Sequence, residues 1–87
     1  MKTSERLDPK VQFGQRLREL RLKAGLSQES LAELAGLDRT YISGCERGRR
    51  NASIEALHRL GKALQIPPSF LLEPSDSTTS SSDKDFQ

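Results

Sequence analysis

The sequence predicts an all-α fold of five short helices around a small apolar core. Apolar residues recur at three- and four-residue spacings, Ser or Asp precedes three of these segments, and Gly or Pro follows each of them. No stretch alternates polar and apolar residues as a strand would. The chain of 87 residues is enough for one small domain, and with 5% aromatic residues its core must come from Leu, Ile and Ala.

The first two predicted helices are bounded by glycine and serine. The first spans residues 11–24 and ends at Gly25, which suits a left-handed cap. The second spans residues 28–35, follows Ser27 as its N-cap and ends at Gly36. The residues expected to face the core are Phe13, Leu17, Leu20 and Ala24 in the first helix, and Leu31, Leu34 and Ala35 in the second.

Three further helices are predicted from the same signals. The third spans residues 39–47 after the N-cap Asp38, and the fourth begins after Ser53. Pro67 and Pro68 stop the fourth helix and can start a short fifth one. The expected inward residues are Ile42, Cys45, Ile54, Leu57, Leu60, Ala63 and Leu64, and the apolar residues of the fifth helix are Phe70, Leu71 and Leu72.

Charge and composition divide the chain into three parts. Residues 1–10 are expected to form a loose polar arm, residues 11–73 the helical domain, and residues 74–87 an acidic, Ser-rich tail too poor in apolar residues to become ordered. Residues 1–72 hold 13 of the 14 basic and 8 of the 12 acidic residues and so carry +5, whereas residues 73–87 carry −3. A basic domain of this kind indicates a polyanionic partner.

Composition disfavours several classes of protein. No apolar run reaches the roughly 18 residues of a membrane span, and the N-terminus lacks a secretory signal, so we expect a cytoplasmic location and no membrane partner. One cysteine, Cys45, and one histidine, His58, are too few for a zinc site, so neither a metal nor another cofactor is expected. There is no paired carboxylate, nucleophile–base set or phosphate-binding glycine loop that would predict an enzyme.

The second and third helices carry the most information about function. They are short and joined through Gly36, so they must cross steeply, as in a helix-turn-helix. Residues 26–32, 36–44 and 46–51 read Leu-Ser-Gln-Glu-Ser-Leu-Ala, Gly-Leu-Asp-Arg-Thr-Tyr-Ile-Ser-Gly and Glu-Arg-Gly-Arg-Arg-Asn. In these runs the sequence resembles the Cro/C1-type (XRE) family of helix-turn-helix DNA-binding proteins, and especially the controller proteins of restriction–modification systems, over residues 11–72. The resemblance implies a lambda-repressor-like domain of five helices, a homodimer and a palindromic operator.

The third helix would enter the major groove and present its N-terminal residues to base edges. Arg39 begins this helix, and its planar fork suits the O6 and N7 atoms of guanine; the alternative is a solvated surface arginine. Thr40 and Ser43 share the exposed side and either meet a thymine methyl, a base edge or a phosphate, or make no contact. Gly44 lacks a side chain where members of the resembled family read a base, which would allow close approach to the DNA.

Contacts to the DNA backbone are expected from three places. Gln28 opens the second helix, where the resemblance and the helix N-terminus both favour a phosphate contact over a simple polar first-turn residue. Tyr41 either donates its hydroxyl to a phosphate or packs in the core. A basic loop follows the third helix and either holds phosphates or is only solvated; the residues of this group are Arg47, Arg49, Arg50 and Asn51.

The remaining assignments concern structure and assembly. In the resembled family the positions of Arg21 and Glu46 form a largely buried ion pair. Cys45 is interpreted as a core filler rather than a redox sensor, and His58 as a surface or interface residue rather than a ligand. Four helices can cover the core, so surplus apolar residues predict a homodimer interface. The alternative is that the fifth helix packs on its own domain, and the two are compatible. These interface residues are Ile66, Phe70, Leu71 and Leu72.

The expected function is that of a sequence-specific transcriptional regulator. A homodimer would bind double-stranded DNA near a promoter and either block RNA polymerase or contact it. The alternative is an antitoxin or other protein-interaction module, whose acidic tail binds a partner and which regulates its own synthesis through DNA binding.

Overall fold

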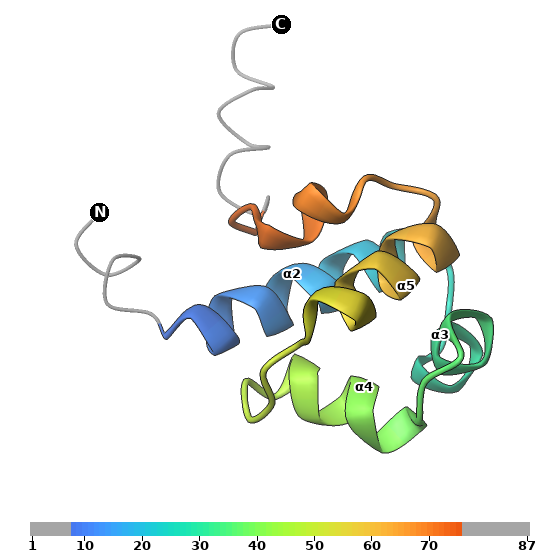
Figure 1. Cartoon of the computed structure of the whole chain (residues 1–87), viewed down its shortest axis with the longest axis horizontal. Coiled ribbons are helices and arrows are strands. Elements are labelled where there is room, and N and C mark those ends of the chain that lie inside the picture. Colours follow the sequence, from blue (N-terminus) through green and yellow to red (C-terminus); the bar gives the residue numbers. More distant parts are fainter. Residues whose placement is uncertain (1–7, 76–87) are drawn as a thin grey trace, which may run out of the picture.

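Four α-helices and one 3₁₀ segment make up residues 8–75, the part of the chain that the computed structural model describes (Figure 1). The helices are α2 (Pro9–Lys23), α3 (Gln28–Ala35), α4 (Arg39–Glu46) and α5 (Ile54–Leu64), and the 3₁₀ segment is η1 (Pro68–Leu72). No strand occurs within these residues, which confirms the predicted all-α class. The fifth predicted helix is therefore only a short 3₁₀ segment. None of the helices in this part of the chain combines the length and apolarity needed to cross a bilayer.

Serine caps the starts of α3 and α5, and glycine ends α3, as predicted. Ser27 Oγ accepts a hydrogen bond from the backbone N–H of Ser30, and Ser53 Oγ accepts one from that of Ala56, both at 3.0 Å. Each bond satisfies an N–H group that a helix start leaves unpaired. Gly36 ends α3 in the left-handed conformation, with a φ of 71°. Asp38 occupies the N-cap position of α4 but makes no side-chain cap bond.

Helix α2 begins two residues earlier than predicted. Asp8, which was expected to lie in the arm, is its N-cap and accepts a hydrogen bond from the backbone N–H of Lys10 at 2.8 Å, which lowers the pKa of Asp8. Pro9 fits the first turn, where its missing N–H has no intrahelical partner to lose. Asp8 and Pro9 therefore start a helix rather than belonging to the loose arm. Residues 1–7 of the predicted arm and residues 76–87 of the predicted tail lie outside the described residues.

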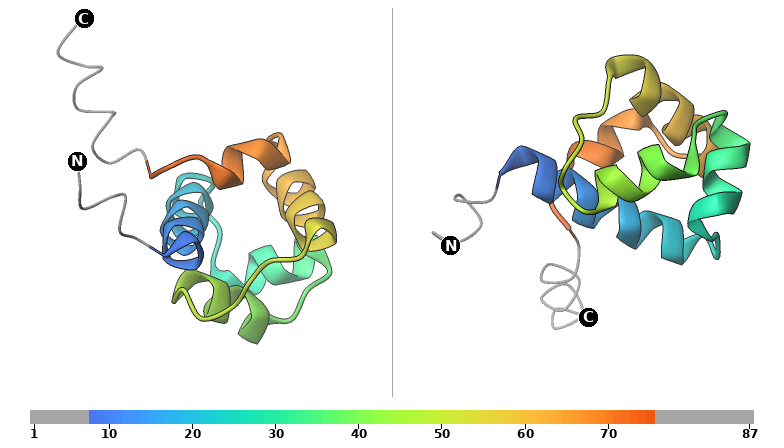
Figure 2. Two further views of the ribbon diagram at one scale, coloured as in Figure 1. Left: turned by 60° about the vertical axis from the view of Figure 1, so that its left-hand side comes forward. Right: turned by 90° about the horizontal axis from the view of Figure 1, so that it is seen from below.

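All five elements contribute side chains to one core. Figure 2 shows the elements arranged as a ring, and each packs on the next: α2 on α4, α4 on α3, α3 on α5, α5 on η1, and η1 on α2. Each element contributes at least one fully buried side chain, and their close packing gives so small a domain a continuous core. The fully buried side chains are Leu17, Leu31, Ile42, Cys45, Leu60 and Leu71.

Three residues predicted to face the core are exposed. Leu34 is 63% exposed, because the two turns of α3 bury the stripe of Leu31 and Ala35 and leave Leu34 beside it. Ile54 is 72% exposed, since it is the first residue of α5 and precedes the first buried residue of that helix. Ala24 is the exposed C-cap of α2. Helical spacing alone did not show where each buried stripe begins and ends.

Helices α2 and α4 come into backbone contact at Gly14. A Cβ atom at this position would overlap the carbonyl oxygen of Cys45 and lie 2.8 Å from that of Glu46. These are backbone atoms of a packed helix, so a side chain at Gly14 requires the two helices to separate. The position of α4 against α2 therefore depends on this glycine.

A buried arginine fastens η1 to α2. Arg16 is 3% exposed, and its Nε donates to the carbonyl oxygen of Phe70 at 2.8 Å. Its guanidinium also lies 3.5 Å from the carboxylate of Glu19 and 3.6 Å from that of Glu73. Such charge-assisted bonds hold the segment that brings Leu71 into the core.

Candidate nucleic-acid interface

Helices α3 and α4 cross steeply, and α4 lies along the edge of the molecule (Figure 1). The turn that joins them is fastened at two points. The N–H of Leu37 donates to the carbonyl of Ala32 at 2.9 Å, and Arg59 Nη1 on α5 donates to the carbonyl of Gly36 at 3.5 Å. The orientation of α4 is thus held by both α3 and α5.

The four residues expected to read bases follow one another along α4. Arg39 and Thr40 are exposed in the first turn, and Ser43 and Gly44 are half-buried one turn later. An exposed first turn on the second helix of such a pair is the surface that enters a major groove in helix-turn-helix proteins.

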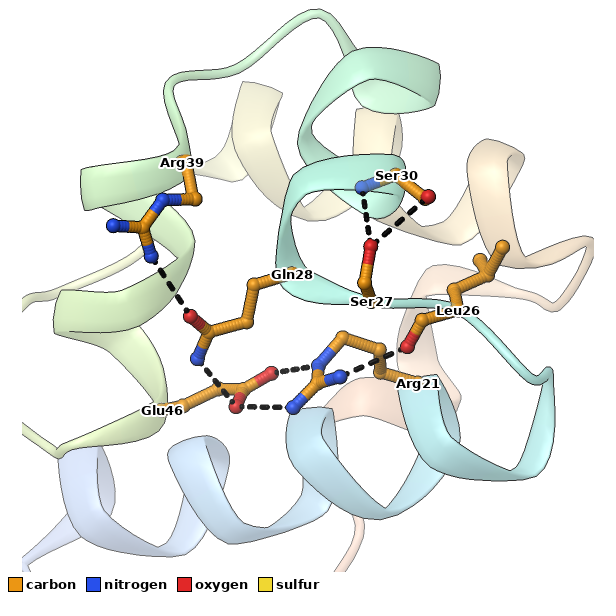
Figure 3. A network of polar contacts seen from close by, with 7 residues as sticks. All are labelled: Arg21, Leu26, Ser27, Gln28, Ser30, Arg39 and Glu46. Atoms are coloured by element: carbon orange, nitrogen blue, oxygen red, sulfur yellow. Dashed lines mark hydrogen bonds and ion pairs between the residues drawn. The ribbon is translucent and has the colours of Figure 1, made fainter.

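The expected ion pair between α2 and α4 is present and lies beneath this surface (Figure 3). Arg21 Nε donates to Glu46 Oε2 at 2.6 Å, and Arg21 Nη2 donates to Glu46 Oε1 at 3.0 Å. The side chains of Arg21 and Glu46 are 7% and 4% exposed. The hydrogen bonds with the Glu46 carboxylate raise the pKa of Arg21 above its usual value. Arg21 Nη1 also donates to the carbonyl of Leu26 at 2.8 Å, so one guanidinium joins α2, α4 and the start of the helix-turn-helix.

Gln28 connects this buried pair to the first residue of α4 (Figure 3). Its Nε2 donates to Glu46 Oε1 at 3.1 Å, and its Oε1 accepts a hydrogen bond from Arg39 Nη1 at 3.4 Å. The phosphate contact expected of Gln28 stays a prediction; in the structure its amide binds Glu46 on one side and Arg39 on the other. Gln28 thereby links the exposed Arg39 side chain to the buried ion pair.

Tyr41 was expected either to contact a phosphate or to pack, and in the structure it is half-buried and bonded to the following loop. Its hydroxyl donates to the carbonyl of Asn51 at 3.4 Å and accepts from the N–H of Ser53 at 3.2 Å. The guanidinium carbon of Arg50 lies 5.1 Å from the centroid of its ring, within the range of a cation–π contact. Tyr41 therefore fastens the basic loop to α4.

The basic loop lies directly beyond the C-terminus of α4. Arg47 is the C-cap of the helix, and the N–H of Arg49 donates to the carbonyl of Gly44 at 2.9 Å. The side chains of the group are exposed: Arg47, Arg49, Arg50 and Asn51. Exposed cations are thus present both at the start of α4, in Arg39, and directly beyond its end, and cations of this kind can bind a phosphate backbone.

Cys45 and His58 have the environments of structural residues. Cys45 is fully buried, and this burial raises the pKa of its thiol to about 11. A neutral, inaccessible thiol is a poor nucleophile, which favours the core-filler interpretation over redox sensing. His58 is exposed on α5.

The predicted dimer interface needs one correction. Leu71 is fully buried within its own domain, because Arg16 holds η1 against α2. Ile66 is half-buried and packs against the core, whereas Phe70 is 39% and Leu72 is 64% exposed. Of these four residues, Phe70 and Leu72 are the two that leave substantial apolar surface free for a second copy.

Sequence reasoning missed the roles of Gly14, Arg16 and Gln28 in holding the site together. Arg16 could have been suspected, since it lies three residues after Phe13 and so falls on the inward side of α2. Nothing in the local sequence distinguishes Gly14 from a glycine tolerated on a helix surface. The bridging role of Gln28 depends on elements far apart in the sequence.

Comparison with known proteins agrees with this geometry. Residues 12–70 match the family model described as a helix-turn-helix domain. The chain is 48% identical over 62 residues to the control protein C.BamHI of Bacillus amyloliquefaciens, covering 70% of this chain and 76% of that relative. It is similar to the crystal structure of the restriction–modification controller protein C.AhdI from Aeromonas hydrophila, with a TM-score of 0.70, 58% identity, and coverage of 71% of this chain and 94% of that one. The regulator SinR, solved in complex with DNA, matches with a TM-score of 0.67 and 35% identity over 70% of this chain and 98% of that one.

The chain therefore belongs to the Cro/C1-type helix-turn-helix family of DNA-binding transcriptional regulators. Within that family it is similar to the controller proteins of restriction–modification systems.

Proposed function

We propose that the protein is a homodimeric transcriptional regulator that reads a palindromic operator by placing α4 in the major groove. The observation that carries this proposal is the exposed Arg39 at the start of α4, linked through Gln28 to the buried pair of Arg21 and Glu46. The bond from Gln28 favours one orientation of the Arg39 guanidinium, and a side chain oriented before binding loses less entropy when it meets a base. Similarity to the controller proteins and to SinR supports the assignment.

The proposed complex has two kinds of contact with DNA, one to bases and one to phosphates. Arg39 reads a guanine edge, with Thr40 and Ser43 beside it on the same surface. The basic loop holds phosphates and fixes the register of α4 without reading sequence. Control of transcription then follows from the position of the bound dimer relative to RNA polymerase, which it excludes or contacts. The acidic tail, on which the alternative of a protein-interaction module rests, lies outside the described residues apart from Pro74 and Ser75.

Replacing Arg49 by alanine should weaken binding to all DNA sequences alike. Each phosphate neutralised contributes about −0.9 to the slope of log K against log salt, so the slope should become shallower by about 0.9 per protomer. Fluorescence anisotropy on one specific and one random duplex across a salt series measures both effects. A change in base preference, or an unchanged slope, would show that Arg49 does not hold a phosphate.

Replacing Leu72 by glutamate should convert the dimer into a monomer. Leu72 is 64% exposed beside the partly exposed Phe70, and a buried charge without a partner is costly at an interface. Sedimentation equilibrium should show the wild type at twice the chain mass and Leu72→Glu at the chain mass, with weaker operator binding. Leu34→Glu is the matched control, because Leu34 is 63% exposed on α3 and should leave the dimer intact. Dimers in both variants would rule out this interface.

A further inference from the structure

Gly44 stands inside α4 at a place where the backbone does not require glycine. Left-handed backbone at glycine occurs at Gly25, Gly36 and Gly48 but not here, so an L-residue would fit the local conformation. Glycine is an unfavourable residue within a helix because it loses the most conformational freedom on folding. The glycine is therefore explained by the side chains that pack against this position rather than by the backbone.

The neighbour that occupies this space is the side chain of Arg50. A Cβ atom on Gly44 would lie 3.3 Å from Arg50 Cγ and 3.5 Å from both Cδ and Nε of Arg50. The aliphatic stem of Arg50 thus lies flat against the bare backbone of α4. It fills the surface where a side chain of the helix itself would otherwise stand.

The far end of Arg50 is held one turn earlier along the same helix. Its guanidinium carbon lies 5.1 Å from the centroid of the Tyr41 ring. The hydroxyl of Tyr41 in turn binds the backbone of Asn51 and Ser53, which fixes the loop from which Arg50 comes. Arg50 therefore folds back from the loop toward the N-terminal half of α4, where Arg39 and Thr40 are exposed.

We propose that Gly44 is a positioning residue, which lets Arg50 lie across α4 and brings its guanidinium to the DNA-facing surface, where it binds a phosphate at the groove edge. Arg50 is then part of the recognition surface although it comes from the loop. This inference rests on the proposed function, since it requires that α4 face DNA. The planar guanidinium suits both partners, because it stacks on a ring and still offers N–H donors at its edge.

A double-mutant cycle tests the positioning role. Gly44→Leu places a good helix former where Arg50 lies and should weaken operator binding about tenfold, as should Arg50→Ala. The double variant should bind no more weakly than Arg50→Ala alone, because Gly44 acts through Arg50. Gly44→Ala, whose added atom needs a shift of only a few tenths of an ångström, should show a smaller loss and guards against misfolding of the leucine variant. Losses that multiply in the double variant would mean that Gly44 makes room for DNA directly, which would overturn the proposal.

A measurement without DNA separates this proposal from the proposed function. Tyr41 is the one tyrosine of a chain that has no tryptophan, so intrinsic fluorescence reports on its ring. A cation beside the ring attracts iodide but not neutral acrylamide, so the ratio of iodide to acrylamide quenching should fall equally in Gly44→Leu and Arg50→Ala. An unchanged ratio in Gly44→Leu would overturn the positioning of Arg50. A fallen ratio with unchanged DNA affinity in both variants would instead overturn the phosphate contact assigned to Arg50.

Discussion

Replacing Glu46 by alanine should lower the free energy of unfolding by about 3–5 kcal/mol, because it leaves the buried guanidinium of Arg21 without its counter-charge. The same change removes the acceptor of Gln28 Nε2. Small domains have little stability in reserve, so such a loss is a large part of the roughly 5–15 kcal/mol typical of folded proteins. Urea denaturation followed by circular dichroism measures the effect.

The matched control for this variant is Glu55→Ala on α5. Glu55 also pairs with an arginine, Arg59, at 3.3 Å, but the two side chains are 76% and 47% exposed. Exposed pairs of this kind contribute less than about 1 kcal/mol, so Glu55→Ala should change stability little. Equal losses in the two variants would contradict a structural role for the buried pair. Glu46→Gln, which keeps the shape and an acceptor oxygen, should fall between them.

Gly14→Ala should destabilise the domain by about 3 kcal/mol or more, although alanine is the better helix former. The new methyl group would overlap the carbonyl of Cys45 and press on that of Glu46, so α2 and α4 must move apart. Because α4 carries Arg39, operator binding should weaken along with stability. Thermal unfolding and anisotropy on the same samples measure the two losses.

Gln15→Ala provides the control for Gly14→Ala. Gln15 is the next residue of α2 and is exposed, so the substitution tests helix propensity without a clash. Its stability should stay within about 0.5 kcal/mol of the wild type. A Gly14→Ala protein as stable as this control would show that the contact between α2 and α4 is looser than the structure indicates.

The sequence predicted those parts of the fold that depend on local signals. The cap serines, Ser27 and Ser53, bind a backbone N–H three residues later, and Gly36 takes the left-handed conformation that ends α3. These roles involve only near neighbours in the sequence, so they could be inferred without tertiary structure. Leu34 and Leu71 were misplaced because their burial depends on which neighbour covers each face. A helix of eight residues has too few turns for spacing to choose between two faces, and η1 is buried only because Arg16 holds it.

The candidate site likewise has parts that the local sequence predicts and parts that it does not. The position of Arg39 at the start of α4 followed from the motif, as did the pairing of Arg21 with Glu46 from family resemblance. The contacts of Gln28 could not be foreseen, because Glu46 lies 18 residues and Arg39 lies 11 residues further along the chain. The placement of Arg50 on Gly44 and Tyr41 likewise depends on how the loop turns back on α4.

The most direct measurement is in vitro selection of bound DNA with the wild type and with Arg39→Ala. The wild type should enrich a palindrome with half-sites about one helical turn apart and a guanine at one position of each half-site. Arg39→Ala should enrich the same spacing, lose the preference for that guanine, and bind about 1–3 kcal/mol more weakly per half-site. Enrichment of the same guanine by both proteins, or of no sequence by the wild type, would contradict the placement of α4 in the major groove with Arg39 reading a base.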